Sequence, residues 1–318
     1  MPKTFLLLAL LGCYSLLLSA QKGHYAPPIK GPLLVTGTFG ELRSDHFHAG
    51  LDFRGAVGTP VYSVADGYIS RVLISAGGYG QAIYVDHLDG YRSVYGHLSA
   101  LRDDLIDTVR SLQYEWEQFT LDLRFDSLAF PVRQGDQIGK IGNRGYSFGP
   151  HLHFEIRDQA SDTPLNPLDF GIKVADTRPP QLRQLKLYEL DQNLNTIREI
   201  PLELSRLKSG DYTVQSAPIE VYSPIIGTGI KAYDRQNGMP NYNGIYSAHL
   251  YRDTTNLLHG FTYDSISYEE TRYLNAHTDY AAWNANKSWF HRLYLLPGDA
   301  LSFYENPTKI KQGDERTP

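Results

Sequence analysis

Two closely spaced histidines are the residues of this chain best suited to chemistry. They lie in the stretch Gly149-Pro150-His151-Leu152-His153-Phe154-Glu155. Its apolar, β-prone residues predict a strand, in which His151 and His153 share one face because successive side chains alternate. Two such imidazoles can bind a metal together, or one can bind while the other transfers protons. Because two ordinary histidines would give the same pattern, the rest of the chain has to decide.

Three residues elsewhere could complete such a site. His48 and Asp52 are four positions apart, and Gly50 between them lets the backbone bend so that imidazole and carboxylate converge. His97 follows a predicted strand and a glycine, a position where functional residues often occur. The remaining histidines are interpreted as loop, structural or surface residues: His24, His46, His87, His249, His259, His277 and His291.

The composition restricts the kind of site. The chain has 318 residues, enough for two domains, and one cysteine, Cys13. An intrachain disulfide and a thiolate metal site are therefore excluded, so a metal would need nitrogen and oxygen ligands. The formal net charge of -5 gives no reason to expect nucleic acid as a partner.

The elements that must position these residues are mainly strands. Short β-prone segments at 61–65, 68–74, 82–86 and 91–95 are separated by turns, and the last two form a hairpin. Apolar residues then recur every three to four positions over 99–117, which predicts a helix, and residues 119–125 alternate as a half-buried strand. We interpret this helix and this strand as packing elements.

The second half of the chain follows a segment, 176–180, that has the composition of a linker. Beyond it, short apolar alternations broken by Asn, Gly and Pro predict a small β-sandwich-like domain over 181–318. The polar end from Asn306 lacks a closing apolar strand, which fits either an incomplete domain or a frayed tail.

The first 20 residues are predicted to be a signal peptide, with a basic Lys3, an apolar segment at 5–18 and small residues at the end. Leu10-Leu11-Gly12-Cys13 also resembles a lipoprotein cleavage box. Cys13 is then either a lipid anchor, the one membrane attachment we expect, or a filler in a discarded peptide. In both cases the protein is exported to the periplasm or cell envelope, or secreted.

Seven short motifs follow one another between residues 34 and 170. They are His48-Ala-Gly-Leu-Asp52, Gly58-Thr-Pro-Val61, Ala65-Asp-Gly67, Gly78-Tyr-Gly80, Tyr95-Gly-His-Leu98, Gly135-Asp-Gln-Ile-Gly139 and Gly149-Pro-His-Leu-His-Phe-Glu155. In this order they resemble the zinc metallopeptidases of the M23 (LytM/lysostaphin) type. Each motif is weak alone, but the joint match is highly specific.

The resemblance implies a mainly β fold. An antiparallel β-sheet metallopeptidase domain with one inserted helix would occupy residues 21–175, with its core at 34–170 and an insertion at about 99–130. The β-sandwich-like domain would follow it.

The resemblance also implies a site. His48, Asp52 and His153 would bind one Zn²⁺, and His97 and His151 would be catalytic histidines that are not ligands. Two imidazoles and one carboxylate leave a fourth tetrahedral position open, as a catalytic zinc requires, and such a zinc lowers the pKa of bound water to about 7. Which histidine activates the water and which stabilises the oxyanion or protonates the leaving amine stays open.

Family members that act on the cell wall cut peptide bonds in peptidoglycan, in stem peptides or cross-bridges. The resemblance therefore implies a metalloendopeptidase whose partner is a peptidoglycan peptide. Tyr79, Tyr95 and Phe148 flank the motifs and would line the peptide groove, or simply pack. Two features depart from the family pattern. The connection 99–130 is long and could cover the groove, and Arg144 stands where a small polar residue is more usual.

Three alternatives stay open. A catalytically silent LytM-type binding module could regulate other cell-wall hydrolases, although all five site positions are filled here. Two histidines and a carboxylate also form the facial triad of non-haem iron oxygenases, but that site would leave His97 and His151 without a role. An active peptidase could also use its C-terminal domain as an anchor or autoinhibitor. The sequence predicts neither the bond that is cut nor the oligomeric state.

Overall fold

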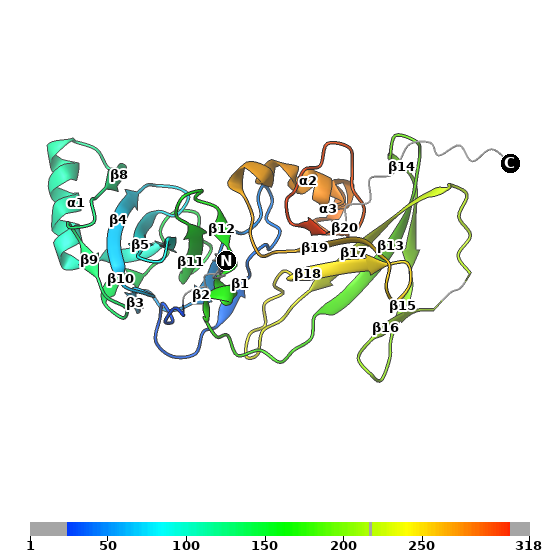
Figure 1. The fold of residues 1–318 in the computed structure, drawn as a ribbon, viewed down its shortest axis with the longest axis horizontal. Helices are drawn as coiled ribbons and strands as arrows, with labels where there is room; N and C mark the ends of the chain where they lie inside the picture. Colours follow the sequence, from blue (N-terminus) through cyan, green and yellow to red (C-terminus); the bar gives the residue numbers. More distant parts are fainter. Residues whose placement is uncertain (1–23, 216–217, 306–318) are drawn as a thin grey trace, which may run out of the picture.

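The computed structural model describes residues 24–215 and 218–305. The expected signal peptide, Cys13 and the polar end from Asn306 lie outside these residues. Figure 1 shows an N-terminal half beside a C-terminal half, both built mainly from antiparallel strands. The mainly β fold class is confirmed. Among the described residues, no helix combines the length and apolar composition that crossing a bilayer requires.

The N-terminal half is built on one large antiparallel sheet. Its strands lie in the order β1 (Val35–Gly37), β2 (Leu51–Arg54), β11 (His151–Asp158), β6 (Tyr91–Gly96), β5 (Gln81–His87), β4 (Gly67–Ile74) and β8 (Leu121–Arg124). Two short strands extend it, β12 (Pro164–Leu165) beside β11 and β9 (Pro131–Val132) beside β4. A smaller sheet contains β3 (Pro60–Tyr62), β10 (Gln137–Ile141) and β7 (Leu98–Leu101). The predicted hairpin is the pair β5–β6.

Strand β11 is the strand that matters for the site, because it lies between β2 and β6. The register places His153 opposite Asp52 of β2 on one side and opposite Gly96, which ends β6, on the other. Phe53 and Phe154 from these strands are fully buried, and their rings lie 6.2 Å apart. A slip of one residue would turn this apolar set away from the core, so packing fixes the register.

The expected insertion forms α1 (Asp103–Glu115) and strand β8, close to the predicted helix and strand. Leu105 and Val109 are buried on the inner side of the helix. Strand β8 pairs along β4, at the end of the molecule farthest from the C-terminal half (Figure 1). Both segments are packing elements, as predicted.

The C-terminal half contains several small antiparallel sheets rather than two large ones. They are β14 (Thr196–Leu202), β13 (Gln181–Leu190), β17 (Ile225–Tyr233) and β20 (His291–Arg292); β15 (Leu204–Arg206) and β16 (Tyr212–Val214); and β18 (Ser247–Tyr251), β19 (Leu257–Thr262) and β21 (Tyr304–Glu305). Short helices that the sequence did not suggest lie between them: η2 (Tyr268–Tyr273), α2 (Leu274–His277) and α3 (Tyr280–Asn286). In the first half, η1 (Pro167–Phe170) follows β12.

One hydrophobic core runs through both halves. Phe39, Phe47 and Phe154 of the first half belong to the same buried cluster as Phe261 and Tyr263 of the second. Gly40 lies against the Tyr263 ring so closely that a Cβ there would be 2.4 Å from it. The two halves are therefore packed together, while the expected domain boundaries at 175 and 181 stay a prediction.

Three histidines of the C-terminal half are buried: His259, His277 and His291. His277 contacts the hydroxyls of Tyr263 and Tyr304, each at 3.0 Å. Neither ring nitrogen of His259 has a hydrogen-bond partner among the residues that the structure describes. Burial lowers the pKa of His259 to about 4 and that of His291 to about 3.

We expect His259→Leu to weaken the pH dependence of folding. Because the pKa of His259 is about 4 when folded and 6.5 ordinarily, the unfolded chain takes up a proton first as the pH falls below 6.5. Stability is lost over this window by about 1.4 kcal/mol per pH unit for each such histidine. Urea unfolding at pH 7.5 and pH 5 measures it, and the loss between them should be about 2 kcal/mol smaller in the variant.

Comparing the two pH values within each protein removes any packing change caused by leucine. A pH dependence identical to that of the unmodified chain would contradict this role of His259.

Candidate metal centre

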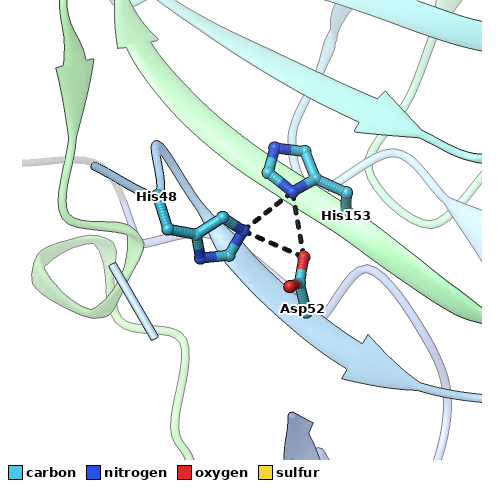
Figure 2. Close-up of side chains that lie close together, drawn as sticks. All are labelled: His48, Asp52 and His153. Atoms are coloured by element: carbon cyan, nitrogen blue, oxygen red, sulfur yellow. Dashed lines mark hydrogen bonds and ion pairs between the residues drawn. The ribbon is translucent and has the colours of Figure 1, made fainter. Parts of the chain in front are cut away.

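Three side chains converge at one end of β2 and β11. Nε2 of His48 lies 3.0 Å from Oδ1 of Asp52 and 3.0 Å from Nδ1 of His153. Nδ1 of His153 lies 2.9 Å from the same Asp52 oxygen. Figure 2 shows the three groups pointing toward one another. All three residues are buried, and the described part of the chain offers no other such group of His, Cys, Asp and Glu ligands.

The backbone brings these residues together in two ways. Asp52 and His153 are opposite each other across the β2–β11 ladder. His48 precedes β2 in a tight loop, where its amide donates to the Glu41 carbonyl and its carbonyl accepts from the Gly40 amide. Gly50 is needed for close packing rather than for bending, because a Cβ there would lie 2.3 Å from the carbonyl oxygen of Phe154.

Hydrogen bonds on the far side of each ring decide which nitrogen faces the centre. Nδ1–H of His48 donates to the Thr38 carbonyl oxygen at 2.8 Å, because a carbonyl can only accept. Nε2–H of His153 donates to Oε1 of Glu155 at 2.7 Å. The inward atoms are therefore Nε2 of His48 and Nδ1 of His153. Asp52 turns Oδ1 inward, while its Oδ2 accepts from Arg43 at 3.1 Å.

Electrostatics favours a positive charge among these three atoms. Burial alone would raise the pKa of Asp52, but its contacts with His48, His151 and His153 hold that pKa well below its ordinary value. For His153, burial alone would lower the pKa, but its hydrogen bonds to Asp52 and Glu155 raise the pKa to about 9. Either a proton on His153 or a divalent cation supplies this positive charge. Two imidazoles with one carboxylate are suitable ligands for such a cation.

His97 and His151 lie beside this group. The His97 ring centre is 4.7 Å from that of His151 and 5.8 Å from that of His153. Nδ1–H of His97 donates to the Arg144 carbonyl at 2.7 Å, and Nδ1–H of His151 donates to the Gly149 carbonyl at 2.8 Å. Their Nε2 atoms are therefore the acceptors, and Nε2 of His151 lies 3.5 Å from Oδ1 of Asp52. The structure thus brings together all five residues singled out in the sequence.

His97 adopts an unusual backbone conformation. Its φ is 60°, in the left-handed region that costs a non-glycine residue about 1 kcal/mol or more. His97 is the first residue after β6. In this conformation its ring contacts that of His151. Burial and the neighbouring histidines lower the pKa of His97 to about 4, so its ring is neutral at pH 7.

The sequence analysis assigned no role to Glu155, Arg157 or Arg43. Glu155 is fully buried and accepts from His153 and from Nε of Arg157, the latter at 2.7 Å. Strand alternation was a usable signal, because positions 151, 153 and 155 share a face. The sequence carried no comparable signal for Arg43. The unusual Arg144 contributes its backbone carbonyl to His97, and its side chain donates to Gln81 at 2.7 Å.

The site opens into a cleft of 1110 Å³ that both halves of the chain line. Tyr79 and Phe148, two of the three expected groove residues, are among its lining residues. Tyr95 is not, because its fully buried ring packs on Phe154 and its hydroxyl accepts from the Val64 amide at 3.0 Å. Its expected place in the groove is therefore corrected to a place in the core. The C-terminal half contributes Met239, Asn241, Tyr268, Trp283 and Trp289.

The insertion does not cover the cleft. No residue of the segment 99–130 is among those that line it, since α1 and β8 pack at the far edge of the sheet. The expectation that this segment could cover the groove is therefore corrected.

The part of the chain that contains the candidate metal centre resembles known proteins. The family model "Peptidase family M23" matches residues 46–113 and 129–167, which include His48, Asp52, His97, His151 and His153. The unmatched residues between these ranges fall within the expected insertion.

Two curated relatives match about half of the chain. Mpg, a DD-carboxypeptidase/endopeptidase of Neisseria meningitidis, is 30% identical over 172 residues, which cover 52% of this chain and 33% of Mpg. The peptidoglycan DD-endopeptidase ShyA of Vibrio cholerae is 32% identical over 152 residues, 46% of this chain and 29% of ShyA. The chain thus spans about a third of the length of these relatives.

A solved structure, the catalytic domain of the M23 protein EnpA from Enterococcus faecalis, aligns at 27% identity with a TM-score of 0.36. It covers 47% of this chain and all of that domain. The antiparallel sheet and the His/Asp/His group define a domain of the metallopeptidase kind. The family match is more specific: this region of the chain matches the model of peptidase family M23.

We expect His48→Ala to abolish retention of a divalent metal, because it removes one of three inward-facing ligand atoms. The matched control is His46→Ala, two positions away, whose ring is half-exposed and contacts Asp45 at 2.7 Å. Elemental analysis of both purified variants gives the metal per chain. Equal metal content in the two would show that His48 is not a ligand.

Proposed function

We propose that this protein is a zinc-dependent endopeptidase that cuts peptide bonds in the stem peptides or cross-bridges of peptidoglycan. The observation that carries the proposal is the packing of Nε2 of His48, Oδ1 of Asp52 and Nδ1 of His153 within about 3 Å of one another. Two further imidazoles beside this group match the needs of hydrolysis. The match to the M23 family model and the names of the relatives support the same assignment.

His48, Asp52 and His153 would hold the ion. Zinc suits nitrogen and carboxylate ligands in a tetrahedral arrangement, and when bound it would polarise an amide carbonyl and acidify a water molecule. Glu155 and the Thr38 carbonyl keep the two histidines in the tautomers that present a lone pair to the centre. Arg43 binds the second oxygen of Asp52 and so favours a single inward oxygen.

His97 and His151 would handle the protons. Each has its Nδ1–H tied to a backbone carbonyl, so Nε2 carries the lone pair that can accept a proton from water. After accepting it, the same nitrogen can donate to the leaving amine or hydrogen-bond to the oxyanion. The depressed pKa of His97 keeps this ring neutral near pH 7.

The cleft suits an extended peptide. It is open, lined by both halves, and flanked by Tyr79 and by Phe148, whose side chain is fully exposed. These two residues would contact the substrate. Peptidoglycan lies outside the cytoplasm, so the proposal includes export by the segment 1–20, with or without a lipid on Cys13.

The direct test is digestion of purified peptidoglycan with the zinc-loaded full chain, followed by mass spectrometry of the fragments. We expect new amine and carboxylate ends at one type of peptide bond, which also identifies the bond. Binding to peptidoglycan without any released fragment would favour the alternative of a regulatory module. Iron in place of zinc, with oxygen consumption, would favour the oxygenase alternative.

Replacing His97 or His151 by alanine should lower the rate of digestion by about 10²–10⁴-fold, the usual contribution of general acid–base catalysis. Zinc content should stay at one ion per chain, because neither residue would be a ligand. The His46→Ala protein serves again as the control for zinc content. Full activity in either variant would refute this division of roles.

A further inference from the structure

One side chain of the C-terminal half reaches the residues directly behind the metal centre. Tyr268, the first residue of η2, places its hydroxyl 3.0 Å from Oε2 of Glu155 and 2.8 Å from Nη2 of Arg157. The same hydroxyl lies 2.9 Å from that of Tyr79. These four residues form a closed hydrogen-bond network, with one member supplied from more than 100 positions away in the chain.

This network lies directly behind a metal ligand. Glu155 accepts the Nε2–H of His153 at 2.7 Å, and that bond turns Nδ1 of the ring toward Asp52. A carboxylate that is fully buried has to be held by other donors, or it will rotate or draw in water. Nε of Arg157 holds Oε2, and the Tyr268 hydroxyl reaches both oxygens, at 3.2 and 3.0 Å.

A second contact joins the same helix to the residue that precedes the other histidine ligand. The hydroxyl of Thr271, one turn after Tyr268, accepts from the amide of Phe47 at 3.0 Å. Phe47 precedes His48 and is buried against Tyr263 and Phe303 of the C-terminal half. Helix η2 therefore contacts the chain beside both histidine ligands.

We propose that Tyr268 is a positioning residue of the metal centre, and that the C-terminal half is thereby a component of the centre rather than an appended module. The Tyr268 hydroxyl holds the Glu155 carboxylate in place, and Glu155 orients His153 toward the ion. The Tyr268 ring also lies over the Arg157 guanidinium, with Cζ of Arg157 4.9 Å from the centre of the ring, and it covers the guanidinium from solvent. The inference rests on the proposed metal centre, but not on which bond is cut.

The test is the affinity of the full chain for Zn²⁺, measured by competition with a chromophoric chelator. Tyr268→Phe keeps the ring over Arg157 and removes only the hydroxyl. Removing the direct partner of a metal-binding histidine weakens metal binding by about 10- to 100-fold. Because Tyr268 acts through Glu155, we expect the dissociation constant for Zn²⁺ to rise by about 10-fold, the lower end of that range. The matched control is Tyr273→Phe at the other end of η2, whose hydroxyl contacts only Arg272 among the bonds that the structure describes.

Thermal unfolding of the metal-free proteins separates positioning from a general structural role. Because Arg157 and Tyr79 still donate to Glu155 when the Tyr268 hydroxyl is removed, we expect both variants to unfold at the same temperature as the unmodified chain. An unchanged affinity in Tyr268→Phe would overturn the proposal, and so would an equal loss in Tyr273→Phe. The readout is binding, so a failure to digest peptidoglycan would be registered separately, as a failure of the proposed function.

Discussion

The rest of the structure depends on one constraint, the close approach of three atoms that carry lone pairs. They come from His48, Asp52 and His153. Such atoms about 3 Å apart repel one another unless a positive charge lies among them. They stay together because the register of β2 on β11 is fixed by buried phenylalanines on the opposite face. The apolar core therefore maintains an electrostatic arrangement that the polar groups alone would not keep.

Behind the inward-facing atoms lies a layer that consists largely of backbone. Carbonyls of Thr38, Arg144 and Gly149 accept the outward N–H groups of three histidines. A carbonyl is available at any residue type, so these loops can change side chains while keeping their path. This explains how Arg144 can occupy a position where a small polar residue is more usual. Glu155 is the exception, since it accepts from His153 and from Arg157 with its side chain.

The parts of the structure that could be predicted from sequence depend on local periodicity. Alternation placed His151 and His153 on one face, and the spacing of apolar residues gave α1 and β8. Tyr95 is opposite the buried Phe154 and points into the core, whereas His97, two residues later, reaches the site because β6 has ended and its backbone is left-handed. Tyr268 had no local signal, because its partner Glu155 is 113 positions away. The helices at 268–286 contain tyrosines and asparagines that favour strands and turns, and tertiary packing overrides that preference.

The insertion has a consequence for solubility. Without β8, the long strand β4 would present much of its edge to solvent, and unpaired edges invite association with other chains. Strand β8 covers part of that edge and forms a new border only four residues long. Leu121 and Leu123 point into the core, whereas Asp122 and Arg124 face outward, with Asp122 paired to Arg71. A short, charged border of this kind discourages edge-to-edge aggregation of the folded protein.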